Sequence, residues 1–263
     1  MAINVDTVYK TVLMILNKEQ RGVMTPQEFS KIASRVQSDI FETYFTDYNA
    51  LLNKAPQTPE DYYNKTDAIS DKLAPFRVYG ECIYKSATGT FIMPETTSNG
   101  ITVIDSANTI FLTSSQRHFY RLGELTYEPD TLPIDVQLVT RTELNKIQRS
   151  EMTRATEFSP LYLLENSAET DKQTSITVVP STIQDNLHAS FIVKPRDVSW
   201  NFITGNRGEY LFDGTSTHFE LHSSEQTNVI NRILFYAGVV VRDPNIIQSA
   251  NQEMQRDEIN KKS

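Results

Sequence analysis

The chain has 263 residues, enough for one large domain or two closely joined ones. Its net charge of −8 and pI near 5.1 argue against a protein that attracts nucleic acid or acidic membranes through its overall charge. The single cysteine, Cys82, excludes an internal disulfide framework, fits folding in a reducing cytoplasm and is expected to be a small core residue. The apolar run at 12–16 is too short for a membrane helix and lacks a basic leader, so we expect no signal peptide and no membrane span.

The first 75 residues predict three helices, at about 4–18, 24–52 and 58–75. The second helix has the clearest start signals. Thr25 is placed to cap it, Pro26 suits the first helical position, and Glu28 is placed to reach back to the cap. Met24 and Phe29 have the spacing of a hydrophobic staple. We therefore expect a long helix from this point.

One side of this second helix is apolar and aromatic. Its residues recur at steps of three and four: Phe29, Ile32, Ala33, Val36, Ile40, Tyr44, Tyr48 and Leu51. An ordinary core helix is the simpler interpretation. The sharper hypothesis is that part of the stripe contacts another subunit, with Phe41, Tyr44, Phe45 and Tyr48 as the candidate interface residues.

From residue 76 to 222 the pattern changes to short runs typical of β-strands. They lie at 77–84, 89–93, 101–104, 134–139, 175–179 and 189–193, with a turn at 99–100 and a short helix at 143–152. A last helix is predicted from Ser223, where Ser223 and Gln226 have capping-box spacing and apolar residues follow up to Val241. The sequence thus predicts an α+β fold. Helical regions at 1–75 and 223–263 pack together beside a strand-rich region at 76–222.

No common catalytic motif appears, whether a P-loop, a dinucleotide loop, an HExxH pair or a GxSxG elbow. The best metal candidate is the group His218, Glu220 and His222, because strand alternation places all three on one face. The same alternation fits an ordinary solvated strand with Phe219 and Leu221 in the core, which is the simpler interpretation. We predict no cofactor and no bound metal.

Two further segments have some features of ligand sites. Residues 194–196, with Trp200 and Phe202 nearby, combine basic and aromatic side chains as some nucleic-acid surfaces do. The acidic total charge and the tendency of aromatics to fill cores favour burial instead. Residues 205–208 and 213–214 are typical of turns and lack the strand-to-helix context of a phosphate loop.

Three parts of the chain resemble structural proteins of tailed bacteriophages, the crAss-like phages in particular. They are residues 24–45, residues 191–200, and residues 219–222 continuing into 231–238. The resemblance implies a non-enzymatic ring or connector in the neck or tail, made in the host cytoplasm and incorporated in the virion. Its implied partners are further copies of the chain, the portal, other neck or tail proteins, and genomic DNA in passage. Such rings are commonly twelvefold in short-tailed particles.

The physical pattern is compatible with that role, because repeated head-to-tail contacts close into rings when their rotation permits. An acidic inner wall would also limit adhesion of passing DNA. Two alternatives stay open at this point: a receptor- or glycan-binding tail component, and a phage-encoded hydrolase whose site no motif reveals.

Overall fold

The computed structural model describes residues 3–18, 24–53, 67–97, 100–104, 116–129, 132–166, 174–206 and 208–241, with a few helical residues beyond. The chain divides into two compact units. The helical unit comprises Met1–Pro75 and Pro195–Ser263, and the strand unit comprises Phe76–Lys194. The α+β class is confirmed. Residues 195–222, which the sequence pattern groups with the strands, belong to the helical unit.

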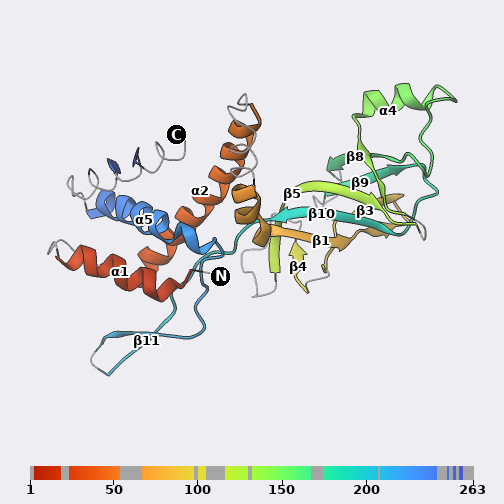
Figure 1. Cartoon of the computed structure of the whole chain (residues 1–263). Coiled ribbons are helices and arrows are strands. Elements are labelled where there is room, and N and C mark those ends of the chain that lie inside the picture. The colour runs from red at the N-terminus through yellow and green to blue at the C-terminus, as the bar shows by residue number, and fades with distance from the viewer. Residues whose placement is uncertain are drawn as a thin grey trace. The chain divides into compact units, whose positions relative to one another are not determined.

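The helical unit is a small bundle that carries a β-hairpin (Figure 1). Its elements are α1 (Val5–Lys18), α2 (Pro26–Asn53), the 3₁₀ turn η2 (Ser223–Glu225), α5 (Gln226–Val241), and the hairpin strands β11 (Phe202–Thr204) and β12 (Tyr210–Phe212). Residues 67–73 are also helical and run into the 3₁₀ turn η1 (Ala74–Phe76). The predicted start of that helix, at 58–61, lies outside the described residues. Helix α5 packs against both α1 and α2, which confirms that the first and last helices share a bundle.

The predicted start of α2 is confirmed by its hydrogen bonds. The Thr25 N–H donates to the Glu28 carboxylate at 2.9 Å, and the Glu28 N–H donates to Thr25 Oγ1 at 3.3 Å. The first of these bonds, from the Thr25 backbone, holds the pKa of Glu28 below its usual range. Met24 and Phe29 are both buried. Helix α5 begins differently from the prediction, because His222 rather than Ser223 caps η2, its Nδ1 accepting from the Ser224 N–H at 3.3 Å.

The apolar stripe of α2 is core. Of the stripe residues with described side chains, Phe29, Ala33, Val36, Ile40 and Tyr44 are at most 3% exposed, and Ile32 is half-buried. The apolar face of α5 is equally buried, with Val229, Ile233 and Ala237 fully inaccessible. Burial of two apolar helix faces against each other is the main driving force for such a bundle.

The strand unit consists of two sheets. One has the order β1-β10-β5-β4, with β6 beside β5, and the other has the order β2-β3-β9-β8-β7. The strands are β1 (Arg77–Glu81), β2 (Ile83–Lys85), β3 (Thr90–Ile92), β4 (Thr102–Ile104), β5 (Gln116–Tyr127), β6 (Ile134–Asp135), β7 (Gln137–Leu138), β8 (Leu161–Asn166), β9 (Thr174–Val179) and β10 (Leu187–Val193). Side chains from both sheets, including Phe91, Ile176 and Phe191, form one hydrophobic cluster. The unit is therefore built around a core that the two sheets share.

Several predicted strands have different limits in the structure. The run at 77–84 breaks at Cys82 into β1 and β2, which belong to different sheets. Cys82 is buried at the break, and its N–H donates to the Leu187 carbonyl at 2.7 Å. The helix predicted at 143–152 is α4 (Arg141–Gln148), which starts earlier because Thr140 and Glu143 form a capping box.

Candidate assembly interface

The predicted interface residues on α2 lie mainly inside the chain. Phe41 and Tyr44 are 2% and 3% exposed, so neither ring offers surface to a neighbouring subunit. Phe45 is half-buried, with its ring centroid 5.2 Å from that of Phe41. The side chain of Tyr48 lies outside the described residues. Phe41 and Tyr44 therefore fill the core of the helical unit, as the simpler interpretation predicts.

The predicted metal group has three separate structural roles. His218 Nδ1 accepts from the Val5 N–H at 3.3 Å, Glu220 accepts from Arg196 Nε at 2.6 Å, and His222 caps η2. The segment is not a regular strand, although Phe219 and Leu221 do point into the core as predicted. Nowhere in the described part of the chain do three His, Cys, Asp or Glu side chains gather as metal ligands.

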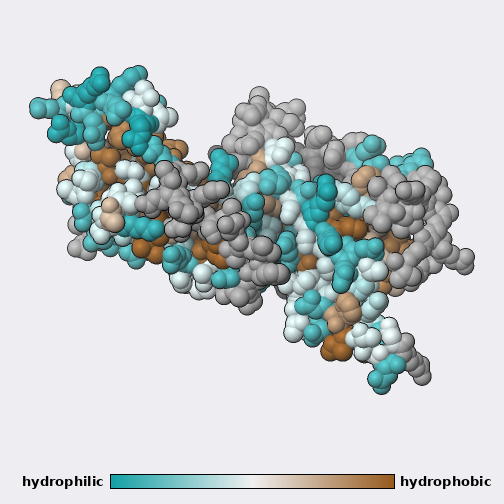
Figure 2. All heavy atoms as spheres, turned by 180° about the vertical axis from the view of Figure 1, so that it is seen from behind, coloured by the Kyte–Doolittle hydropathy of each residue, from teal (hydrophilic) through white to brown (hydrophobic). Residues whose placement is uncertain are grey.

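Exposed apolar side chains of the helical unit gather on the β11–β12 hairpin, which extends away from the helices of its own unit (Figure 1). Ile203, Tyr210, Leu211 and Phe212 are 60%, 51%, 51% and 36% exposed. Hydrophobic side chains are visible on this projection in the space-filling view (Figure 2). Apolar side chains concentrated on a projecting element are typical of protein-binding surfaces.

Both faces of the hairpin carry apolar residues. The pairs Phe202–Phe212 and Thr204–Tyr210 share one face, and the pair Ile203–Leu211 occupies the other. The sequence signals the turn between the strands, and Gly208 adopts the positive φ of 79° that glycine tolerates best. A two-stranded hairpin of this length is only marginally stable alone in water, so it must be held from its base.

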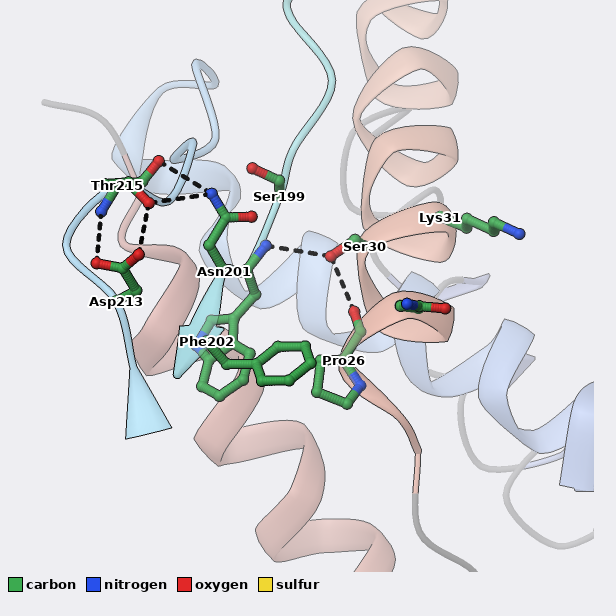
Figure 3. Close-up of a pocket in the computed structure, with 10 residues that line it drawn as sticks. Pro26, Ser30, Lys31, Ser199, Asn201, Phe202, Asp213 and Thr215 are labelled. Carbon is green, nitrogen blue, oxygen red and sulfur yellow. Dashed lines mark hydrogen bonds between the residues drawn. The ribbon is translucent and has the colours of Figure 1, made fainter. Parts of the chain in front are cut away.

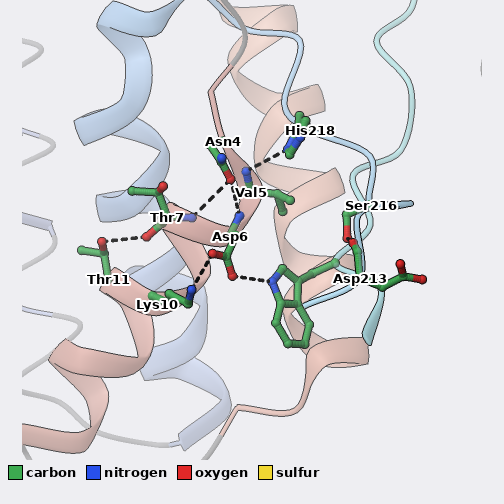
Figure 4. Close-up of polar contacts among 10 residues, drawn as sticks. Asn4, Val5, Asp6, Thr7, Lys10, Thr11, Asp213, Ser216 and His218 are labelled. Atoms are coloured by element: carbon green, nitrogen blue, oxygen red, sulfur yellow. Dashed lines mark hydrogen bonds and ion pairs between the residues drawn. The ribbon is translucent and has the colours of Figure 1, made fainter. Parts of the chain in front are cut away.

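Aromatic contacts fix the hairpin to the bundle. Trp200 precedes β11 and is 4% exposed, with its ring centroid 4.3 Å from that of Tyr9 on α1 and 6.0 Å from those of Phe202 and Phe212. Its indole N–H donates to Asp6 Oδ1 at 3.2 Å (Figure 4). Trp200 thus links the hairpin to α1 through both packing and a hydrogen bond.

Polar residues of α2 hold the same segment along its backbone. Ser30 Oγ accepts from the Trp200 N–H at 3.1 Å, and Ser34 Oγ accepts from the Val198 N–H at 3.0 Å. One turn further, buried Gln37 donates to the Arg196 carbonyl at 2.6 Å. The three side chains are spaced four and three residues apart, so they form a row along one side of the helix. Because they bond to backbone atoms, this row fixes the path of the chain into the hairpin.

A pocket of about 560 Å³ lies between the first turns of α2 and the base of the hairpin (Figure 3). Trp200 and Phe202 supply its aromatic lining, and Asn201, Asp213 and Thr215 supply polar groups. These polar groups bond to one another: the Asn201 amide donates to the Thr215 carbonyl at 3.2 Å, and Thr215 Oγ1 donates to Asp213 at 2.8 Å. The pocket walls are thereby held in place by the hairpin base itself.

A buried ionic group lies elsewhere in the helical unit. Glu225 is 3% exposed, and its carboxylate accepts from Lys72 Nζ at 2.6 Å and from the Asn228 amide at 2.8 Å. The buried hydroxyl of Tyr44 has no hydrogen-bond partner among the described residues, and burial raises its pKa strongly. The pairing of Glu225 offsets much of the cost of removing its charge from water.

A compact cluster of ionisable side chains lies in the strand unit. The Tyr79 hydroxyl donates to Glu128, and the Tyr79 ring stacks on that of His188 with centroids 5.3 Å apart. Burial, followed by the bond to Glu128, raises the pKa of Tyr79 to about 12. None of the three residues lines the pocket described above. A phenol held protonated by a carboxylate on an open sheet face is better suited to structure than to proton transfer.

The chain matches no known protein family and no curated protein in the comparisons made. None of the helices described by the structure combines the length and the apolar character that a membrane crossing requires. The sequence pattern indicates Trp200 and Phe202 only as part of a possible nucleic-acid surface, for which burial is the simpler interpretation. The spacing of Ser30, Ser34 and Gln37 beside the apolar stripe of α2 is the sequence signal that could have revealed how the segment leading into the hairpin is held.

Proposed function

We propose that this protein is a non-enzymatic structural component of a phage virion, forming a ring in the neck or tail that links the portal to the tail and surrounds the path of the DNA. The observation that carries the proposal is the β11–β12 hairpin, which exposes apolar side chains on both faces and is fixed at its base. An element of this kind gains stability when a protein partner covers it.

Two further features support an assembly role. The sequence resembles phage structural proteins at both ends and in its middle. The anchoring of the hairpin by Trp200, Ser30 and Ser34 also limits the conformational entropy lost on docking, because the segment is already ordered. Pre-organisation of this kind favours repeated, identical contacts such as those of a ring.

Cryo-electron microscopy of intact particles tests the proposal directly. The expected result is ordered density for many copies of this chain around the neck or tail axis, with the hairpin of each copy against a protein neighbour. Density for the chain in another part of the particle, or its absence from purified particles, would overturn the assignment. Native mass spectrometry of the isolated chain provides the copy number for comparison.

A second candidate function is recognition of a host-surface glycan, and the pocket at the hairpin base is the observation that favours it. It combines aromatic rings with amide, hydroxyl and carboxylate groups, the combination typical of sugar-binding sites. A glycan array with the purified chain tests this function. Binding that is lost in Phe202→Ala and Asn201→Ala variants, while their circular dichroism is unchanged, would favour receptor recognition over assembly.

A further inference from the structure

The two faces of the hairpin differ in charge. Ile203 and Leu211 form the cross-strand pair of one face. Strand alternation places Glu209 and Asp213, two residues before and two after Leu211, on this same side. The Glu209 carboxylate lies over Gly205, where an added Cβ would come within 2.8 Å of it. This face, called here the acidic hairpin face, is therefore an apolar pair between two carboxylates, of which that of Asp213 also accepts from Thr215 Oγ1 at 2.8 Å at the hairpin base.

The strand unit carries a surface of the opposite kind. Ile192 of β10 is paired with Arg77 of β1 on one side and with Arg121 of β5 on the other, so all three side chains share one face of the sheet. Lys194 follows two residues later, with its Nζ 5.5 Å from the centre of the Tyr120 ring. The end of the face that carries these residues, called here the basic sheet face, is an apolar residue between cations, while Glu81 and Glu124 lie on the same face toward its other end.

The three cations are available to a partner. Arg77, Arg121 and Lys194 are exposed. Within the part of the chain that the structure describes, none of them forms an ion pair. Three such charges close together are notable in a chain whose net charge is −8. An acidic protein surface is the partner that such a cluster favours.

The dimensions of the two faces agree. Glu209 and Asp213 flank β12 and are four residues apart, which corresponds to about 13 Å in an extended chain. Arg77 and Arg121 lie on either side of a central strand, about 10 Å apart at the backbone, and their long side chains cover the difference. Docking would set the Ile203–Leu211 pair over Ile192 and each carboxylate beside a guanidinium, where paired hydrogen bonds are favoured.

We propose that the acidic hairpin face of one copy of this chain docks on the basic sheet face of a second copy. The inference rests on the proposed function, because it names a contact between neighbouring subunits of the ring. The contact joins two different surfaces, so each copy uses both its hairpin and its sheet, and repetition closes a ring when the rotation permits. A hairpin face of this size buries roughly 400 Å², about half of one partner's share of a standard interface, so it forms one part of the subunit contact.

Cross-linking between two separately prepared variants tests the contact. One preparation carries Leu211→Cys, the other carries Ile192→Cys, and both are mixed under mild oxidation at concentrations where the wild-type chain assembles. The native thiol causes little background, because Cys82 is 5% exposed and burial raises its pKa to about 12. We expect a disulfide-linked pair from the mixture and little from either variant alone.

The matched control replaces Ile192→Cys by Met152→Cys, since Met152 is 96% exposed and lies outside the proposed contact. Leu211→Cys with Met152→Cys should give only the background of random collision. The proposal is overturned if the Met152 mixture cross-links as strongly as the Ile192 mixture. It is equally overturned if the chain carrying both Leu211→Cys and Ile192→Cys cross-links only within itself.

Charge reversal provides a second, independent test. Glu209→Lys and Arg121→Glu should each weaken self-association by about 3- to 10-fold, because each places like charges at the contact. The double variant should recover most of the loss, since the two exchanged side chains would again carry opposite charges. Glu157→Lys, on an exposed loop, serves as the control and should assemble like the wild type. A double variant that is as weak as either single variant would contradict the docking.

These experiments distinguish a failure of the proposed contact from a failure of the proposed ring function. If wild-type chains form rings but the residue 211 and residue 192 cysteines do not cross-link, the contact is wrong and the ring function stands. If purified particles lack the chain in the neck and tail, the ring function falls whatever the cross-links show.

Discussion

Trp200 should be among the most important side chains for the stability of the helical unit. It is 4% exposed, and its ring contacts extend from Tyr9 on α1 to Phe202 and Phe212 on the hairpin. A fully buried tryptophan removes roughly 200 Å² from water, which at about 25 cal/mol per Å² corresponds to about 5 kcal/mol. Trp200→Ala retains part of that area but leaves a cavity and removes the hydrogen bond to Asp6. We expect a loss of about 4 kcal/mol in the free energy of unfolding.

Trp200→Phe is the matched comparison, because it keeps an aromatic ring in the same place. It loses some contact area and the hydrogen bond, but Asp6 still accepts from Lys10 Nζ at 2.6 Å and is not left unpaired. The expected loss is about 1–2 kcal/mol. We expect Trp200→Ala to lose more free energy of unfolding than Trp200→Phe, and this order tests the role of the ring as well as the individual values do.

Urea unfolding followed by far-ultraviolet circular dichroism measures both variants. Trp200 is the only tryptophan of the chain, so the fluorescence of the wild type identifies which transition belongs to the helical unit. The reasoning would be refuted if Trp200→Ala lost less than about 1 kcal/mol, or if both variants lost the same amount. Either outcome would mean that the attachment of the hairpin to the helical bundle does not depend on the indole ring of Trp200.

Three further predictions concern other parts of the chain. Lys72→Met should lower the free energy of unfolding by about 3 kcal/mol because it removes the cation that pairs with the buried Glu225 carboxylate. Lys72→Met with Glu225→Gln should recover at least half of this loss in the same urea assay. Thr25→Ala should cost about 1 kcal/mol through the lost cap of α2, whereas Thr25→Ser should be near neutral; equal losses would argue against the capping box. Burial raises the pKa of Cys82 to about 12, so its contribution to stability is present below the unfolded pKa of about 8.5 and is lost as the pH rises toward 12. Unfolding at several alkaline pH values should show a decrease of up to about 1.4 kcal/mol per pH unit that is smaller in Cys82→Ala, and identical slopes would contradict it.

Local signals in the sequence were enough to predict the helices. The residues from Met24 to Phe29 combine a cap, a favourable first position and a staple, and the structure begins α2 at Pro26. Helix periodicity also predicted the buried face of α5, because a period of 3.6 residues maps directly onto one side of a helix. These predictions depend on neighbours within one or two turns.

The strands were harder to predict because their pairing involves distant residues. β5 spans 12 residues and was not predicted, since Arg117, Arg121 and Glu124 interrupt any simple alternation. Its pairing with β10 contains register shifts near Phe191 and Val193, which move side chains from one face to the other. No local pattern contains that information.

By itself, the sequence determined the α+β class and the extent of α1, α2 and α5. It also indicated, as the simpler of two interpretations, that the aromatic stripe of α2 belongs to the core. Only the tertiary structure decided that residues 195–222 return to the helical unit, and that Trp200 anchors an exposed hairpin. The physical reason is the range of the interactions. Helix caps and periodic faces are set by residues close in the chain, whereas the contact of Trp200 with α1 joins residues 194 positions apart through the hydrogen bond to Asp6.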